Sequence, residues 1–159
     1  MNGIGWLPDM LNVNPWNGNT YDELYVIFRR DFVDSQPRYR GFKVWHFNDM
    51  DEGKEAIFWH LTDKGQKPNR YPDLNRSARL SWIRPMLENC PCEGIILDWD
   101  IEESGDIKTY VWLKNHDFVV VLKRMNNGRR RLITAHHLDY PDMRNKLQKK
   151  YERRLGIGT

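Results

Sequence analysis

Two histidines and a threonine are the residues of this sequence best suited to transferring or positioning protons near neutral pH. Thr134 and His136 belong to the run RRRLITAHH, residues 129–137, which has the composition of a β-strand. Because alternate residues of a strand share a face, we expect these two side chains to be neighbours. His60 lies near the end of another β-rich run, AIFWHLT, residues 56–62, and supplies a second imidazole.

Two arginines add positive charge to this set. Arg76 and Arg79 lie three residues apart in a helical run, so both project from nearly the same side and can hold one anion. These residue types suit cleavage of an RNA phosphodiester without a metal, in which a base removes the 2′-hydroxyl proton, cations stabilise charge on phosphorus and an acid protonates the 5′-oxygen. Each residue taken alone also fits a structural role at a strand end or on a solvated face.

Two motifs raise the alternative of metal binding. Asp98 and Asp100 in DWDIEE can share a strand face and bind Mg²⁺, although an acidic turn before a hairpin explains them more simply. Cys90 and Cys92 have no second cysteine pair to complete a zinc site. Glycine-rich phosphate loops, nucleophile elbows and paired zinc-ligand helices are absent from the sequence. We therefore expect no metal and no other cofactor.

Length and composition predict one domain. A chain of 159 residues with 40% hydrophobic residues, seven tryptophans and seven tyrosines is long enough for one sizeable, aromatic core. We interpret residues 1–19 as an irregular arm and residues 20–159 as the domain itself. Since neither a signal peptide nor an apolar run of membrane-spanning length is evident, we expect a protein of the cytoplasm without membrane association.

The net charge of +3 is modest but unevenly distributed. Arginines occupy all of residues 129–131, and residues 142–155 carry six Lys or Arg against two acidic residues. Local positive charge of this kind is typical of phosphate-binding surfaces, and it is equally typical of an ordinary solvated face.

Helical signals occupy two segments within the first 90 residues. TYDELYVIFRRDFVD, residues 20–34, has helical periodicity and begins with Thr20 and Glu23 at the spacing of a capping box. LNRSARLSWIRPMLENC, residues 74–90, is also helical, and Pro85 is expected to break it into two short helices.

The rest of the chain predicts strands and a last helix. FKVWHF, residues 42–47, is β-rich, and from Gly94 onward GIILDWD, IKTYVWL, DFVVVLKRM and RRRLITAHH follow one another with short connections and an NNG turn. YPDMRNKLQKKYERRLG, residues 140–156, predicts a basic C-terminal helix. We expect an α+β fold in which helices pack on a twisted antiparallel sheet, a meander of about four strands.

The order of these elements, with AIFWHLTDK, RSARLSWIRPMLEN and VVVLKRMNNGRRRLITAHHL, resembles the prophage-associated branch of the barnase, EndoU, colicin and RelE-like nuclease superfamily. The resemblance covers roughly residues 20–155. It implies amino-terminal helices on a curved sheet and a metal-independent ribonuclease that acts as a toxin or in conflict between phage and host. Its expected partners are tRNA, mRNA or rRNA and an antitoxin or immunity protein.

The resemblance matches His60, Arg76, Arg79 and Thr134 to positions in the family's cleft, which Lys64 can join from the loop. From the chemistry of the side chains we expect His60 to be the general base or acid and His136 to be its partner. Arg76 and Arg79 are then expected to hold the phosphate, and Thr134 is a positioning hydroxyl.

A second set of residues is expected to contact the substrate. Tyr110 can stack on an unpaired base, with core packing as its alternative role. The other members of this set are Lys64, Arg131, His137, Lys149 and Lys150. Some relatives use a carboxylate as general base, for which Glu55 and Asp63 are the candidates here.

The competing function is a non-catalytic RNA- or protein-binding module that uses the sheet and the basic last helix, since one fold hosts many functions. A related alternative is a small host-takeover protein that contacts its partner through Trp6 and Trp16 of the arm.

Overall fold

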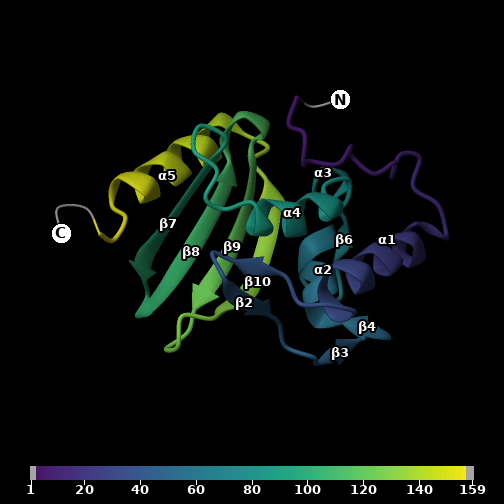
Figure 1. Cartoon of the computed structure of the whole chain (residues 1–159). Coiled ribbons are helices and arrows are strands. Elements are labelled where there is room, and N and C mark those ends of the chain that lie inside the picture. Colours follow the sequence, from purple (N-terminus) through teal and green to yellow (C-terminus); the bar gives the residue numbers. More distant parts are fainter. Residues whose placement is uncertain (1–2, 157–159) are drawn as a thin grey trace.

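The structure, a computed structural model, describes residues 3–156 as an α+β fold with helices beside one curled, mixed sheet (Figure 1). Within these residues the sheet has six strands in the order β1-β2-β10-β9-β8-β7. Their bounds, in that order, are Arg38–Tyr39, Phe42–Trp45, Arg130–His137, Phe118–Arg124, Asp106–Leu113 and Ile96–Glu103. The α+β class predicted from the sequence is confirmed.

The four strands from β7 to β10 form the predicted antiparallel meander. The prediction that the sheet has only about four, antiparallel strands is wrong. β2 pairs in parallel with the start of β10, where Arg130 lies opposite Val44 and Arg131 opposite Trp45, and β1 then pairs with β2. This pairing joins segments far apart in the chain, so no local periodicity or turn signal indicates it.

The run AIFWHLT is a helix, α2 (Ala56–Thr62), and not the strand that its composition predicted. Its buried residues include Ile57, Phe58 and Leu61. A short run that is apolar on almost every side has no period that distinguishes a buried helix from a buried strand, and tertiary burial decided the outcome. His60 therefore lies in the last turn of α2, where it is exposed, and not at the end of a strand.

The first helix, α1 (Thr20–Phe28), continues as a π-helical turn, η1 (Arg29–Val33), and so spans the predicted segment. The predicted capping box is wrong, because Asn19 occupies the N-cap position and Thr20 is already helical. Thr20 Oγ1 instead accepts a hydrogen bond from the backbone nitrogen of Asn17 at 3.0 Å, which ties the helix start to the preceding turn.

The second helical segment consists of α3 (Leu74–Ser77), a 3₁₀ turn, η2 (Leu80–Trp82), and α4 (Ile83–Glu88). The interruption lies between α3 and η2, so the prediction that Pro85 causes it is wrong. Pro85 lies in the first turn of α4, where a backbone nitrogen has no acceptor within the helix and proline is tolerated.

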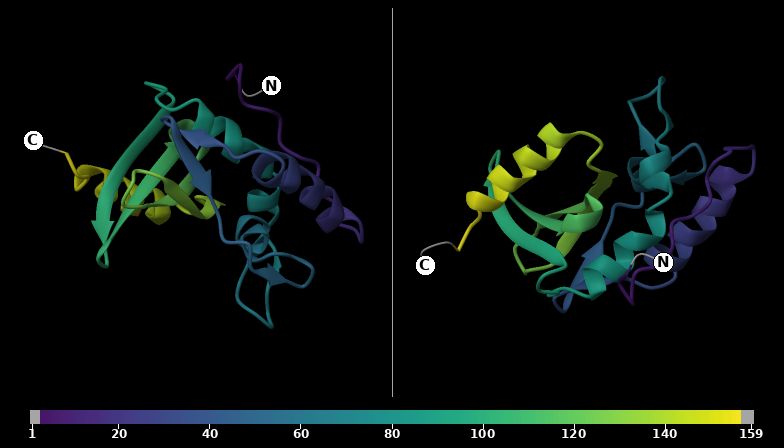
Figure 2. Two further views of the ribbon diagram at one scale, coloured as in Figure 1. Left: turned by 60° about the horizontal axis from the view of Figure 1, so that its bottom comes forward. Right: turned by 90° about the horizontal axis from the view of Figure 1, so that it is seen from above.

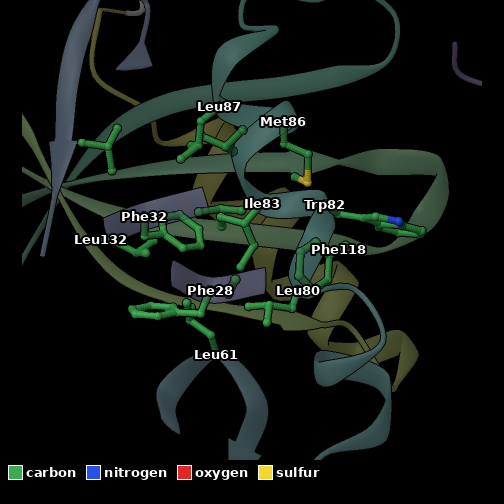
Figure 3. Packing of buried hydrophobic residues seen from close by; sticks show 14 of the residues in the cluster. Phe28, Phe32, Leu61, Leu80, Trp82, Ile83, Met86, Leu87, Phe118 and Leu132 are labelled. Atoms are coloured by element: carbon green, nitrogen blue, oxygen red, sulfur yellow. The ribbon is translucent and has the colours of Figure 1, made fainter. Parts of the chain in front are cut away.

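The sheet is covered on both faces (Figure 2). Helices α1, α2 and α4 bury the larger apolar cluster on one face, around Phe28, Ile83 and Phe118 (Figure 3). The last helix, α5 (Pro141–Glu152), packs against the other face and places Leu147 among residues of β7, β8 and β9. The predicted basic C-terminal helix is confirmed.

Residues 3–19 of the N-terminal arm have no regular secondary structure and lie against the helices. Leu7 is buried, and Trp6 and Trp16 are partly buried against the larger cluster. Trp82 Nε1 donates a hydrogen bond to the backbone oxygen of Pro8 at 2.8 Å. The arm is therefore part of the core packing of the fold.

Short elements complete the fold: β3 (Met50–Asp51) pairs with β4 (Lys54–Glu55), β5 (Asp63–Lys64) pairs with β6 (Tyr71–Pro72), and the 3₁₀ turn η3 (Lys114–His116) joins β8 to β9. Among the residues described, none of the helices combines the length and apolar character needed to cross a membrane.

Gly128, in the turn between β9 and β10, is expected to be more costly to replace than other glycines with positive φ. Its φ is +88°, and an added Cβ would lie 2.5 Å from the Phe42 ring. Gly105 has a similar φ of +85° with no neighbouring atom within 4 Å. Both Gly→Ala changes incur a left-handed backbone cost of about 1–2 kcal/mol, and Gly128→Ala should cost more because of the ring. Urea unfolding of the two variants measures this, and equal losses would contradict the ring contact.

Candidate functional site

Side chains from two other elements meet at the C-terminal end of α2. The backbone oxygen of His60 accepts a hydrogen bond from Arg76 Nη1 of α3 at 2.8 Å and another from Thr134 Oγ1 of β10 at 3.3 Å. Carbonyls in the last turn of a helix lack partners within the helix, so these two donors close that end. We call the following five residues the candidate site: His60, Arg76, Arg79, Thr134 and His136.

Hydrogen bonds between α2 and α3 hold this geometry. Asp73 caps α3, and its Oδ1 accepts a hydrogen bond from the backbone nitrogen of Arg76 at 3.0 Å. Ser77 Oγ donates to the backbone oxygen of Thr62 at 2.7 Å. Since Asp73, Ser77 and Thr62 are all buried, these bonds are shielded from water and keep the two helices in register.

A β-bulge in β10 positions Thr134. The register against β9 shifts between Leu132 and Thr134, and Leu132 and Ala135 both belong to the larger core cluster. The predicted regular alternation of Leu132, Thr134 and His136 on one face is therefore wrong at Leu132. The register shows no further shift between Thr134 and His136, so these two residues remain alternate residues of one strand. Bulges of this kind re-aim side chains beside functional sites.

Both histidines of the candidate site are neutral near pH 7. Burial lowers the pKa of His136 to about 4, and the Arg76 guanidinium acts in the same direction. The pKa of His60 is also lowered, first because the surrounding chain desolvates its ring and second because of Arg76. One cation thus acts on both imidazoles. A neutral imidazole has a free nitrogen that can accept a proton.

Arg76 and Arg79 carry buried donors that lack acceptors. Within the described part of the chain, Nε of neither arginine has a hydrogen-bond partner, although Arg76 Nε lies 3.5 Å from Asp73 Oδ2. Arg79 Nη1 donates to the backbone oxygen of Asn75 at 2.8 Å, and its guanidinium lies 5.2 Å from the centre of the Trp82 ring. Burial lowers the pKa of both arginines.

Asp139 lies at the centre of an adjoining network that sequence reasoning missed. Its carboxylate is 3.2 Å from Lys64 Nζ, 2.9 Å from Asn75 Nδ2 and 2.8 Å from His137 Nδ1. Although burial acts to raise it, these contacts lower the pKa of Asp139 to about 2. Lys64 and His137, predicted to bind substrate, are thus both held by this carboxylate. The position of Asp139 two residues after His137 is the local signal that could have identified it.

Three predicted substrate-binding residues lie away from the candidate site. Tyr110 belongs to the cluster covered by α5, is 8% exposed, and stacks on Trp99 with ring centres 5.4 Å apart. Its hydroxyl bonds to Glu103 and Lys150, and Lys149 is exposed on α5. Because the Tyr110 ring has no free face for an RNA base, we do not retain it as a stacking residue.

Arg131, by contrast, reaches the candidate site. A cavity of about 230 Å³ is lined by Phe47, Asp49, His60 and Arg131, among others. Arg131, which was predicted to contact the substrate, and His60 therefore line the same cavity.

The two carboxylates considered as a general base are engaged elsewhere. Glu55 is buried and accepts a hydrogen bond from the Tyr25 hydroxyl. Asp63 accepts from the Tyr21 hydroxyl at 2.9 and 3.0 Å and lies 3.3 Å from Arg70 Nε, while burial raises its pKa.

The alternative metal ligands also have protein partners. Asp98 lies 2.7 Å from Arg40 Nε, and Asp100 lies 3.2 Å from Arg124 Nη1. Between residues 3 and 156, no cluster of three or more His, Cys, Asp or Glu side chains has the arrangement of a metal site.

Comparison with known proteins shows no relative of this chain: no family matches it, and neither a curated protein nor a solved structure is similar to it. By its fold, the chain is an α+β protein with a curled, mixed sheet. A cluster of histidines and arginines lies at the end of α2. The nuclease resemblance stays a prediction.

We expect the free energy of unfolding to decrease as the pH falls from 6.5 towards 4, in part because of His136. Its pKa is about 4 in the folded protein against an ordinary 6.5, so in this window the unfolded chain binds a proton that the folded chain does not. The stability associated with the neutral His136 ring is therefore fully present above pH 6.5 and is lost as the pH falls towards 4. Urea titrations at successive pH values should show a flatter profile for His136→Gln than for the unchanged protein. An unchanged profile for H136Q would contradict the buried, neutral state.

Proposed function

We propose that this protein is a metal-independent endoribonuclease that cleaves RNA by attack of a ribose 2′-hydroxyl on the adjacent phosphate. The observation that carries the proposal is the meeting of His60, Arg76 and Thr134 at one carbonyl oxygen. The same arginine lowers the pKa of His136. Two imidazoles near one permanent cation match what the reaction requires.

The proposed chemistry uses the two histidines for proton transfer. His60, the more exposed of the two, accepts the proton of the 2′-hydroxyl as that oxygen forms its bond to phosphorus. The bond from phosphorus to the 5′-oxygen breaks, and His136 donates a proton to the departing oxygen. The products are a 2′,3′-cyclic phosphate and a 5′-hydroxyl. His136 takes up its proton when the anionic substrate binds, because a nearby negative charge raises the pKa of an imidazole.

The basic residues hold the phosphate in this proposal. Arg76 and Arg79 supply two guanidinium groups, which match phosphate oxygens geometrically. Lys64 adds a third cation, against the two carboxylates Asp73 and Asp139. The excess of positive charge favours an anionic substrate and stabilises the additional charge of the transition state.

The wider role follows from the same proposal. The protein would act in the cytoplasm on tRNA, mRNA or rRNA, as a toxin or in conflict between phage and host, with an antitoxin or immunity protein as its partner.

The second candidate function is a non-catalytic RNA- or protein-binding module. The exposed cations Lys146, Lys149 and Arg153 on and just after α5 favour it, because they lie on a face that the candidate site does not use. The contacts of Arg76 and Thr134 also have a structural use, since they close the end of α2.

The deciding experiment is incubation of the purified protein with end-labelled RNA in excess EDTA, followed by analysis of the fragment ends. Fragments with 2′,3′-cyclic phosphate ends are expected. Absence of cleavage of transfer, messenger and ribosomal RNA would favour the binding module, and cleavage that requires added Mg²⁺ would return attention to Asp98 and Asp100.

A further inference from the structure

A strip of aromatic and arginine side chains lies at the edge of the sheet beside the candidate site. We call Trp45, His46, Phe47, Arg129 and Arg131 the aromatic–arginine strip. The parallel pairing of β2 with β10 places Trp45 opposite Arg131, and the chain then leaves the sheet towards β3 and α2 (Figure 1). Phe47, in this segment, is 54% exposed, although a large apolar ring is normally buried.

The charges of Arg129 and Arg131 in the strip differ from those of the cations beside them. Lys123, the cross-strand partner of Arg131 in β9, pairs with Asp106, and Arg130 lies 3.5 Å from Asp100. No ion pair to Arg129 or Arg131 occurs among the residues that the structure describes. Their positive charge therefore remains available to an anionic ligand.

Aromatic rings hold these arginines in place. Arg131 Cζ lies 4.3 Å from the centre of the Phe47 ring, and Arg129 Cζ lies 5.9 Å from the centre of the Trp45 ring. The two rings themselves meet edge to face, with centres 5.4 Å apart. Cation–π contacts of this length orient the guanidinium groups and leave their hydrogen-bond donors free.

Two cavities lie along the strip. One, of about 370 Å³, is lined by Trp45 and Arg129 among others, and the other, of about 230 Å³, is lined by Phe47, Arg131 and His60. Trp45 Nε1 is buried and has no acceptor among the described residues. The strip therefore offers aromatic rings and cations beside two cavities, one of which also reaches His60 of the candidate site.

We propose that the aromatic–arginine strip binds single-stranded RNA and leads it to His60. Unpaired bases stack on aromatic rings and on arginine planes, and the phosphates between them pair with arginine charges. Duplex RNA keeps its bases stacked inside the helix and offers no free base to Phe47. Delivery of the strand to His60 rests on the proposed ribonuclease function, whereas binding by the strip does not.

Fluorescence anisotropy with a short, labelled 2′-O-methyl RNA strand tests the proposal, because the blocked 2′-hydroxyl prevents cleavage. Phe47→Ala should weaken binding by about five-fold to 150-fold, which corresponds to about 1–3 kcal/mol for one stacked base. Phe47→Tyr, which keeps the ring, should bind like the unchanged protein. The matched control is Tyr140→Ala, which removes another exposed ring, 65% exposed, outside the strip.

The contribution of Arg131 to RNA binding is measured by the salt dependence of the affinity. Arg131→Ala should weaken binding and reduce the slope of log affinity against log salt by about 1. Arg131→Lys should restore the slope and only part of the affinity, because lysine keeps the charge and loses the planar stack. Thermal melts followed by circular dichroism check that each variant is folded.

The outcomes separate the strip from the catalytic proposal. Equal binding of strand and duplex, or unchanged binding by both F47A and R131A, would overturn the role of the strip, and RNA cleavage in EDTA would then still support the ribonuclease. Binding that depends on the strip, in a protein that cleaves no RNA, would uphold the strip and remove the catalytic proposal. Binding lost in Lys149→Ala in place of the strip variants would assign RNA to α5 and overturn the strip.

Discussion

RNA cleavage by His60→Ala is expected to fall by about 10²–10⁴-fold, the usual contribution of a general acid or base. The side chain of His60 is exposed at the end of α2, and the contacts from Arg76 and Thr134 are made to its backbone oxygen, which the substitution keeps. Stability should therefore change by no more than about 0.5 kcal/mol. Initial cleavage rates and urea unfolding measure the two quantities.

RNA affinity separates catalysis from binding in this variant. H60A should bind the 2′-O-methyl strand almost as tightly as the unchanged protein, since His60 is assigned to proton transfer. His116→Ala is the matched control. His116 lies in η3, outside the candidate site, and its imidazole ring lies edge-on to the Trp82 ring. Cleavage at the normal rate by H60A, or an equal loss in H116A, would show that His60 is not the base.

The second large effect is expected for Arg76→Ala, which should lower cleavage by about 10²–10³-fold. The change removes a cation assigned to the transition state and one of the two donors to His60 O. It should also raise the pKa of His136 and of His60 towards ordinary values, because Arg76 holds both pKa values down. Burial remains, so the rise should be partial. NMR titration of the two imidazole rings measures it.

Arg84→Ala is a closely matched control for this loss. Arg84 is 21% exposed against 18% for Arg76, and its Nη1 also donates to a backbone oxygen, that of Asp31, at 2.8 Å. A 2.8 Å hydrogen bond of this kind contributes to stability at both positions, so R84A should be destabilised without slower cleavage at equal folded fraction. Arg76→Lys should recover little activity, since one ammonium does not reproduce the planar fork. Equal cleavage rates for R76A and R84A would show that Arg76 has a structural role and does not act in catalysis.

The candidate site was predictable in its residue types more than in its geometry. Arg76 and Thr134 were selected for their chemistry, and the structure brings both to His60. The predicted position of His60 at the end of a strand was wrong, because the segment AIFWHLT is a helix. Asp139 was missed because a lone carboxylate after a strand has no pattern of its own until Lys64 and Asn75 meet it. Tyr110 was selected for its ring, and burial removed that ring from the surface.

The aromatic–arginine strip was also predictable in its residue types and not in its contacts. Arg129 and Arg131 were visible in the sequence as a basic run, and Arg130 between them is buried and hydrogen-bonded to Thr109. Alternation along β10 places Arg130 and Arg131 on opposite faces, but the aromatic ring in contact with Arg131 belongs to Phe47, a residue in a distant segment. Only the parallel pairing of β2 with β10 creates that contact.

The sequence by itself determined the α+β class, the β7–β10 meander and the basic α5, because each depends on periodicity and turn residues within a short segment. The tertiary structure alone decided that AIFWHLT is helical, that β2 joins β10, and that His60, Arg76 and Thr134 meet. These outcomes depend on which surfaces are buried together. Burial against distant residues outweighs local propensity and leaves no signal in any one segment of the chain.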